Sequence, residues 1–209
     1  MKKILSTMTV LACLAGAANA APYVLPENQP GALTAYDWTP VYGIDALYAI
    51  GDEDTVPDMW GARASFSLYS QQRASVRHQF SLNVAYETGD KTIKTADYSI
   101  KNDTHVLPIT LGYNVYLAMT DEVALYLGGK AGYSIGEAEL KSRVERKIDT
   151  DGFTFSVGAG LHIQCSDAVY VRVGYEFGRT YADKDDFKPY GIRSNFGQHT
   201  ISLGVGCQF

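Results

Sequence analysis

Six ionisable residues in this sequence could act together. They are three acids and three bases, each set among apolar, small or uncharged neighbours: Asp45, Arg63, Glu87, Lys130, Arg172 and Glu176. Buried charges of opposite sign stabilise one another when they are paired, whereas a single buried charge is costly. Such a set can form a packed network of ion pairs or, if the pairs exchange partners, line a narrow ion path. The packed network is our primary interpretation.

Histidines and hydroxyl groups could support a second kind of chemistry, because acyl hydrolysis needs an activated hydroxyl with a base beside it. The candidates are His78, His105 and His199 as bases and Ser202 as the hydroxyl. In the extended chain inferred below, the histidines lie on or near the outer face, while Ser202 points to the other side. We therefore predict that there are no catalytic residues and that the protein is not an enzyme.

Acidic residues could bind a divalent ion in three places. Two are the clusters Asp52-Glu53-Asp54 and Asp183 with Asp185 and Asp186. The third, Asp149-Thr150-Asp151-Gly152, begins like a calcium loop, but its twelfth position is Gly160 where that loop requires glutamate. Charged side chains in exposed loops are usually just solvated, so we predict neither a metal site nor a cofactor.

These residues must lie on extended segments of the chain, because apolar side chains alternate with small or polar ones along most of the sequence. In the C-terminal segment, residues 200–209, the apolar positions are Ile201, Leu203, Val205, Cys207 and Phe209. A period of two predicts half-buried β-strands. Seven further segments of this kind lie near residues 42–50, 60–69, 79–87, 109–117, 123–135, 153–164 and 169–178.

The two faces of these segments differ in charge. No Asp, Glu, Lys or Arg falls on the apolar faces, and the six ionisable residues fall on the opposite faces. This sorting is expected for a wall with lipid outside, since a lipid-facing lysine or arginine costs about 2–4 kcal/mol at the bilayer midplane. A soluble barrel would have the reverse pattern, with its apolar side chains inside. If the apolar faces of this chain were in water, their aromatic residues would expose on the order of 1,000 Å², more than the largest apolar patch of a typical soluble monomer. The sequence therefore predicts an all-β, eight-stranded antiparallel up-and-down transmembrane β-barrel whose lumen holds the charge network.

The connections between the segments alternate in length. Short turns fall near 71–74, 119–122 and 166–167, and longer polar loops fall near 51–58, 88–104, 136–151 and 182–196. Three short turns and four long loops are typical of eight strands whose two termini lie on the periplasmic side. Pro108 interrupts the pattern, because proline removes a ladder hydrogen bond. We expect the fourth strand to begin near Ile109 or to carry a bulge there.

The N-terminal segment predicts an export signal. Lys2 and Lys3 precede an apolar run over about residues 4–18, and Ala18-Asn19-Ala20 is a small-residue cleavage site, so residues 1–20 form a signal peptide that is removed. Cys13 leaves open the alternative of a lipoprotein signal. Residues 21–40 contain four prolines and form an irregular lead-in to a barrel domain over residues 41–209.

Two cysteines follow this signal, Cys165 and Cys207. We place them on the sixth and eighth strands, whose backbones lie roughly 9.5 Å apart or more with the seventh strand between them. A disulfide needs Cα atoms within about 7 Å. We therefore expect two free thiols that point outward.

In strand count, in loop asymmetry and in its ending Gly204-Val205-Gly206-Cys207-Gln208-Phe209, the chain resembles the eight-stranded outer-membrane barrel family that includes the OmpA transmembrane domain and OmpX. The resemblance covers roughly residues 41–209. It implies that Phe209 is a signal for the barrel-assembly machinery. It also implies that the protein lies in the outer membrane of a Gram-negative-type bacterium, in contact with lipid and lipopolysaccharide.

The resemblance further implies a non-enzymatic, envelope-structural protein with surface-exposed loops for recognition or adhesion of a surface ligand. We expect a monomer. The alternative is a narrow pore for ions or small solutes, which the lumen charges would line. The net charge of −5 and the lack of a basic patch argue against a nucleic-acid partner.

Overall fold

The computed structural model describes residues 41–52, 56–73, 76–94, 99–141, 145–182 and 195–208. Its elements are β1 (Val41–Gly51), β2 (Met59–Arg73), β3 (Val76–Lys94), β4 (Ser99–Ala118), β5 (Val123–Lys141), β6 (Glu145–Asp149), β7 (Gly152–Gln164), β8 (Val169–Ala182) and β9 (Asn195–Gln208). Within this part of the chain, no helix is long and apolar enough to cross a membrane.

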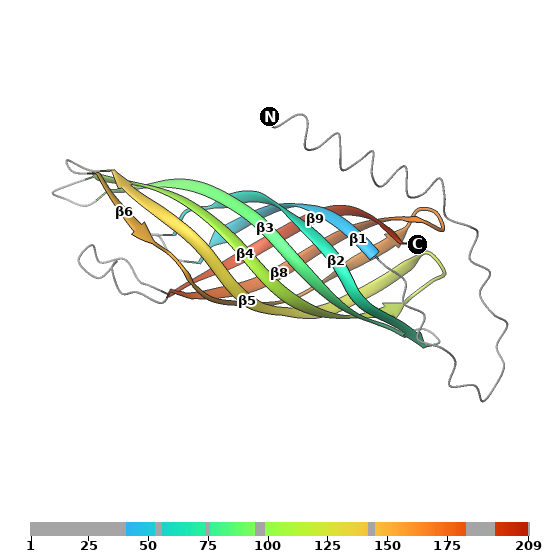
Figure 1. Ribbon diagram of the computed structural model, residues 1–209. Helices are drawn as coiled ribbons and strands as arrows, with labels where there is room; N and C mark the ends of the chain where they lie inside the picture. The colour runs from blue at the N-terminus through green and yellow to red at the C-terminus, as the bar shows by residue number, and fades with distance from the viewer. Residues whose placement is uncertain are drawn as a thin grey trace.

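The strands form one closed antiparallel sheet whose members tilt around a common axis (Figure 1). The order around the ring is β4-β3-β2-β1-β9-β8-β7-β5, and pairing of β4 with β5 closes it. β6 pairs with β5 beyond this ring. The predicted eight-stranded barrel is therefore confirmed. Closure matters in lipid, because it gives the backbone N–H and C=O groups partners where no water is available.

Side chains sort onto two faces as the alternation predicts. Large apolar residues point outward and are among the most exposed, including Trp60 at 59%, Leu111 at 60% and Leu203 at 59%. Asn83 and Asn114 point inward and are buried. An apolar exterior around a polar interior is the arrangement that a barrel adopts in a bilayer.

Three strands are much longer than a membrane requires. β3, β4 and β5 contain 19, 20 and 19 residues, whereas a transmembrane strand needs about 9–11. The predicted loops 88–104 and 136–151 are therefore wrong over most of their length, because these residues continue the strand pairing. Together with β6 they form a four-stranded extension at one end of the barrel (Figure 1). We call this extension, residues 88–94, 99–106, 136–141 and 145–149, the protruding sheet.

β6 and β7 continue one line of pairing along β5, with the same register on both sides of a short break. At the break, Thr150 N donates to Gly136 O at 2.8 Å. The Asp151 carboxylate accepts the Gly136 N–H at 2.9 Å, in place of a backbone carbonyl. The segment that begins like a calcium loop thus joins two strands.

Pro108 lies inside β4, so the expectation that this strand begins near Ile109 is wrong. Pairing of β4 with β3 stops opposite Ala85 and Tyr86 and then resumes in the same register, without a bulge. On its other side, Pro108 pairs with Ser134 of β5. The N–H of a strand residue points to one neighbour only, so a missing N–H interrupts one ladder and leaves the other intact.

No disulfide joins Cys165 and Cys207, as predicted. Cys165 follows β7 and Cys207 lies on β9, so β8 separates them. Cys165 is exposed, whereas Cys207 is buried.

Candidate functional site

One half of the lumen charge cluster is centred on Asp45. Its side chain is 1% exposed and accepts hydrogen bonds from Arg63 Nε at 2.8 Å and from Arg172 Nη2 at 2.6 Å. Strand register brings these groups together, because Asp45 lies opposite Arg63 on β2 and opposite Gly204 on β9. Gly204 in turn lies opposite Arg172 on β8. Glycine is required at this position, since a methyl group there would overlap the Asp45 carboxylate.

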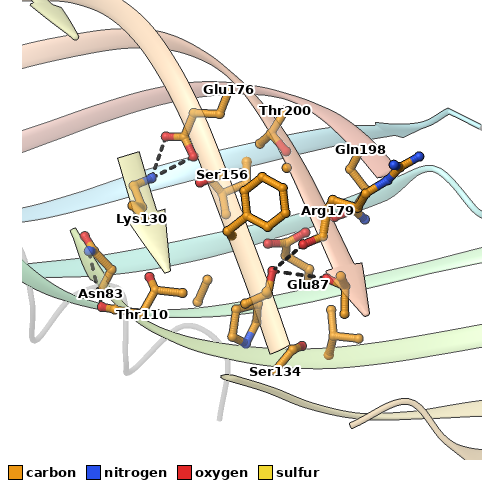
Figure 2. Close-up of a pocket in the computed structure, with 18 of the residues that line it drawn as sticks. Asn83, Glu87, Thr110, Lys130, Ser134, Ser156, Glu176, Arg179, Gln198 and Thr200 are labelled. Carbon is orange, nitrogen blue, oxygen red and sulfur yellow. Dashed lines mark hydrogen bonds and ion pairs between the residues drawn. The ribbon is translucent and has the colours of Figure 1, made fainter. Parts of the chain in front are cut away.

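The other half is centred on Glu176. Lys130 Nζ lies 2.6 Å from both carboxylate oxygens of Glu176, as Figure 2 shows. Arg63 Nη1 lies 2.9 Å from Glu176 Oε1, so Arg63 links Glu176 to Asp45. Five of the six predicted residues therefore form one continuous buried network, in which the attraction between charges offsets the cost of removing them from water.

Glu87 is the exception, and the expectation that all six charges pair directly is wrong for it. Glu87 is 8% exposed and forms no ion pair with any residue that the structure describes, and its Oε2 atom has no hydrogen-bond partner there. Register explains the difference. Glu87 lies opposite Gly61 on β2 and Val106 on β4, neither of which can supply a cation.

A cavity of about 70 Å³ adjoins the network (Figure 2). Besides Glu87, Lys130 and Glu176, its wall contains many side chains with hydroxyl and amide groups: Asn83, Thr110, Ser134, Thr154, Ser156, Thr180, Gln198 and Thr200. A polar cavity needs about 10–15 Å³ for each water molecule. The cavity thus has room for several waters beside the Glu87 carboxylate.

Aromatic rings fill the lumen on the other side of the network, toward the short turns. The Arg77 guanidinium carbon lies 4.3 Å from the centre of the Tyr116 ring, and the Tyr116 hydroxyl donates to Gln79 at 2.7 Å. His162 packs edge-on against Tyr116 and stacks on Tyr170, with ring centres 5.3 and 4.3 Å away. The alternation of apolar and polar residues alone did not predict this layer, although a large ring at an inward position is a usable signal in a barrel this narrow.

The outward face of the protruding sheet carries a second, exposed set of charges. Lys101 bridges Asp90 and Asp103, Lys141 bridges Asp103 and Glu139, and Lys147 bridges Glu139 and Glu137, with N–O distances of 2.7–3.6 Å. We call this set the charge ladder. Hydrogen bonds from Lys147 and Lys141 lower the pKa of Glu139 to about 2. Hydrogen bonds from Lys141 and Lys101 likewise lower the pKa of Asp103.

The inner face of the protruding sheet is apolar. Ile100, Ala138, Leu140 and Ile148 are each 5% exposed or less and form a cluster with Ile93. Residues from all four strands contribute to this cluster. The protruding sheet therefore has a small core of its own beyond the barrel.

The remaining predicted site residues lie apart from the lumen network or outside the described chain. Ser202 is buried on the inner face of β9, whereas His199 contacts Tyr175 and Phe177 at the outside. The described residues contain no group of three or more His, Cys, Asp or Glu placed to bind a metal. Glu53 and Asp54, the acidic cluster within 183–186, and Phe209 lie outside the described residues.

Comparison with solved structures shows the same architecture in proteins of low sequence identity. The barrel of Ail, the attachment invasion locus protein of Yersinia pestis, is 16% identical, with 82% of this chain and 99% of that chain covered and a TM-score of 0.51. Neisserial surface protein A is 14% identical over 82% and 97%, with a TM-score of 0.49. The outer membrane enzyme PagL is 13% identical over 78% and 97%, with a TM-score of 0.50.

These structures include an enzyme, so the shared fold alone does not define an activity. No curated protein matches the chain. The family model for the outer membrane protein beta-barrel domain matches residues 9–209, nearly the whole sequence. The closed eight-stranded ring, its apolar exterior and this match lead to one conclusion: the chain belongs to the outer membrane protein beta-barrel family and resides in the outer membrane of a Gram-negative bacterium.

Proposed function

We propose that the protein is a non-enzymatic, structural barrel of the cell envelope that uses its protruding sheet for recognition or adhesion at the cell surface. The observation that carries this proposal is the charge ladder, which orders seven side chains across four strands beyond the apolar belt. Binding residues are typically presented by surface segments that a rigid scaffold positions. The name of the similar barrel Ail, an attachment invasion locus protein, makes attachment the first activity to test.

The height of the protruding sheet supports a role outside the membrane. On β5 the outward apolar positions end at Ile135, which is 49% exposed, and the next outward residue is Glu137. Lys141 lies six residues beyond Ile135, which is about 20 Å farther along the strand at about 3.4 Å per residue. The charge ladder therefore extends past the hydrocarbon, where a partner at the cell surface could contact it.

The filling of the lumen supports a structural role over the alternative of a narrow pore. The five-residue charge network crosses the interior, and Arg77, Tyr116, His162 and Tyr170 pack below it. An eight-stranded barrel is just wide enough for side chains to fill. Ion flow would require both layers to rearrange.

The contacts of the histidines support a non-enzymatic role. His105 is the histidine whose surroundings come nearest to a catalytic triad, because Thr88 Oγ1 lies 2.9 Å from its Nδ1 atom and Glu137 pairs with it on β5. A triad needs the carboxylate to orient the imidazole. Here Glu137 instead accepts a hydrogen bond from Lys147 at 2.7 Å.

Shortening the protruding sheet tests the proposed attachment function. In one variant, tight two-residue turns replace residues 90–103 and 139–147, which removes most of the charge ladder and leaves the membrane part intact. A matched control carries a replaced turn at 119–122, on the opposite end. Cells that display the shortened barrel should lose attachment to host-cell monolayers, while the control should keep it. Both variants must show the heat-modifiable gel migration of a folded barrel. Equal attachment by both would overturn the proposal.

Conductance across planar bilayers tests the pore alternative. We expect no single-channel steps from the natural protein, because both layers of the lumen are packed. Arg63→Ala and Lys130→Ala each remove one arm of the network and should show whether the charges act as a gate. Steps in the natural protein that change in these variants would favour the pore.

A further inference from the structure

Three of the four histidines in the chain share one arrangement on the outer face. In each, the imidazole Nδ1 atom lies within hydrogen-bond distance of a tyrosine hydroxyl on the neighbouring strand: His78 with Tyr113 at 2.8 Å, His105 with Tyr86 at 3.1 Å, and His199 with Tyr175 at 2.6 Å. The two rings are also stacked, with centres 6.1, 6.3 and 6.0 Å apart. A repeated arrangement on separate strands indicates a common use.

The tyrosine hydroxyl determines which imidazole nitrogen carries the proton. When the phenol donates its O–H to Nδ1, that nitrogen is the acceptor and the proton of the neutral ring resides on Nε2. At His105, Thr88 Oγ1 is a second hydroxyl 2.9 Å from the same nitrogen. The Nε2–H group then faces away from the tyrosine, and among the described residues none accepts its hydrogen bond.

Two of the three pairs lie at the outer edge of the apolar belt. Thr88, beside His105, is opposite Trp60, and His199 is opposite Ile50. Trp60 is 59% exposed and Ile50 is 41% exposed. Beyond this level the outward positions of β4 and β5 carry the charge ladder. Tyrosine and tryptophan concentrate at the headgroup level of a bilayer, where phosphate and ester oxygens are the available acceptors.

We propose that His105 and His199 each bind the phosphate group of an outer-leaflet lipid through Nε2–H, with Tyr86 and Tyr175 holding the rings in the donating orientation. His78 and Tyr113 form the same hydrogen-bonded pair at the inner edge of the apolar belt. The occupant is a membrane lipid, because the next outward residues toward the membrane, Leu107 beside His105 and Ile201 beside His199, are exposed apolar side chains that acyl chains cover. This inference depends on membrane insertion and is independent of the proposed recognition function.

The charges around the two outer histidines are compatible with an anion. Next to His105, Glu137 is engaged by Lys147 and Asp103 by Lys101 and Lys141. Next to His199, the Asp52 carboxylate accepts the Gly197 N–H at 3.0 Å. Arg179 lies opposite Gly197 on β8, lines the lumen cavity and forms no ion pair with a described residue.

Solid-state NMR tests the contact directly. The full-length protein, with ¹⁵N-labelled histidine, is reconstituted in phosphatidylglycerol vesicles, and ¹⁵N–³¹P dipolar dephasing reports phosphate near each Nε2. We expect dephasing at His105 and His199, assigned with H105Q and H199Q, and none at the lumen residue His162. Dephasing no greater than that of His162, or a proton on Nδ1, would overturn the proposal.

Two further samples separate the possible sources of phosphate and the role of tyrosine. In a sugar-headgroup detergent with added inorganic phosphate, dephasing equal to that in vesicles would identify a free-phosphate site and overturn the lipid assignment. Tyr175→Phe should reduce dephasing at His199. Tyr181→Phe, a matched change at an exposed tyrosine that stacks on Phe155, should leave it unchanged. Equal effects of the two substitutions would contradict the orienting role.

Discussion

Replacement of Asp45 by asparagine is the sharpest test of the lumen network. Asparagine has nearly the same volume, so no cavity forms, but among the six predicted lumen charges the substitution leaves two acids facing three bases. Asp45 accepts three hydrogen bonds, one from Arg63 and two from Arg172, and its side chain is 1% exposed. Removing one partner of a buried ion pair costs about 3–5 kcal/mol. We expect a loss of about 3 kcal/mol, because the amide oxygen can still accept one hydrogen bond.

Reversible urea unfolding in lipid vesicles, followed by tryptophan fluorescence, measures this loss. Trp60 is 59% exposed on the outer face and reports loss of the lipid environment. Asp90→Asn is the matched control, because it is the same chemical change at an ion pair whose carboxylate side chain is 66% exposed. Exposed ion pairs contribute little, so the urea midpoint of this control should hardly move.

Two results would contradict a stabilising role for the network. The first is an Asp45→Asn loss no larger than that of the control, which would mean that the buried network adds nothing to stability. The second comes from the double variant Asp45→Asn/Arg172→Met, which removes the excess base as well. If an unpaired buried charge causes the loss, the double variant should recover part of it, and the two changes should therefore be non-additive. If the double variant were less stable than Asp45→Asn by the full amount that Arg172→Met costs on its own, the two changes would be additive. An unpaired buried charge would then not be the cause of the loss.

Three further predictions follow from particular contacts. Gly204→Ala should lower the urea midpoint, because the added methyl overlaps the Asp45 carboxylate. Gly129→Ala should be tolerated, since its methyl meets nothing nearer than Ser156 O at 3.4 Å. Equal urea midpoints for the two variants would contradict this. Carbon-13 NMR titration should place the midpoint of Glu139 near pH 2, below its ordinary 4.5, and Lys147→Met should raise it. The contribution of ionised Glu139 to the stability of the protruding sheet is therefore complete above pH 4.5 and is lost as the pH falls toward 2. If the Glu139 midpoint did not shift in Lys147→Met, the hydrogen bond from Lys147 would not be the cause of the lowered pKa. Tyr116→Ala should cost about 3–5 kcal/mol, because it empties the ring layer against Arg77 and His162, and a midpoint like that of the natural protein would show that this layer is not packed.

The alternation of side chains was sufficient to predict the ring. Each outward position named on β1, from Tyr42 to Ile50, is partly or fully exposed, and Asp45 and Leu47 between them are buried. Lipid enforces this sorting strongly, since a misplaced charge costs several kcal/mol. Short turns at 119–122 and 166–167 are likewise confirmed, because the chain must reverse where two apolar segments meet without a long polar insert.

The network was predicted as a set but not as a set of pairs. Which inward residues meet depends on how the strands are staggered around the barrel, and the stagger is a property of closure that no single segment encodes. Arg63 reaches Glu176 although 113 positions separate them in sequence. Glu87 is also an inward acid, yet the same stagger places it beside Gly61 and Val106, and it forms no ion pair with a described residue.

The protruding sheet was not predicted because the alternation continues past the membrane edge with its two faces exchanged, polar outside and apolar inside. Along β5, Leu127 and Ile135 are exposed and Ser134 between them is buried, as lipid requires. Past Ile135 the outward residues are charged, and the buried ones are Ala138 and Leu140. A search for apolar residues on the outward face therefore ends where lipid ends, although the strand continues. In this chain the alternation continues without a break, but the apolar residues change from the outward to the inward face. This change marks the boundary between hydrocarbon and water, and it separates the membrane barrel from a sheet that folds around a core of its own.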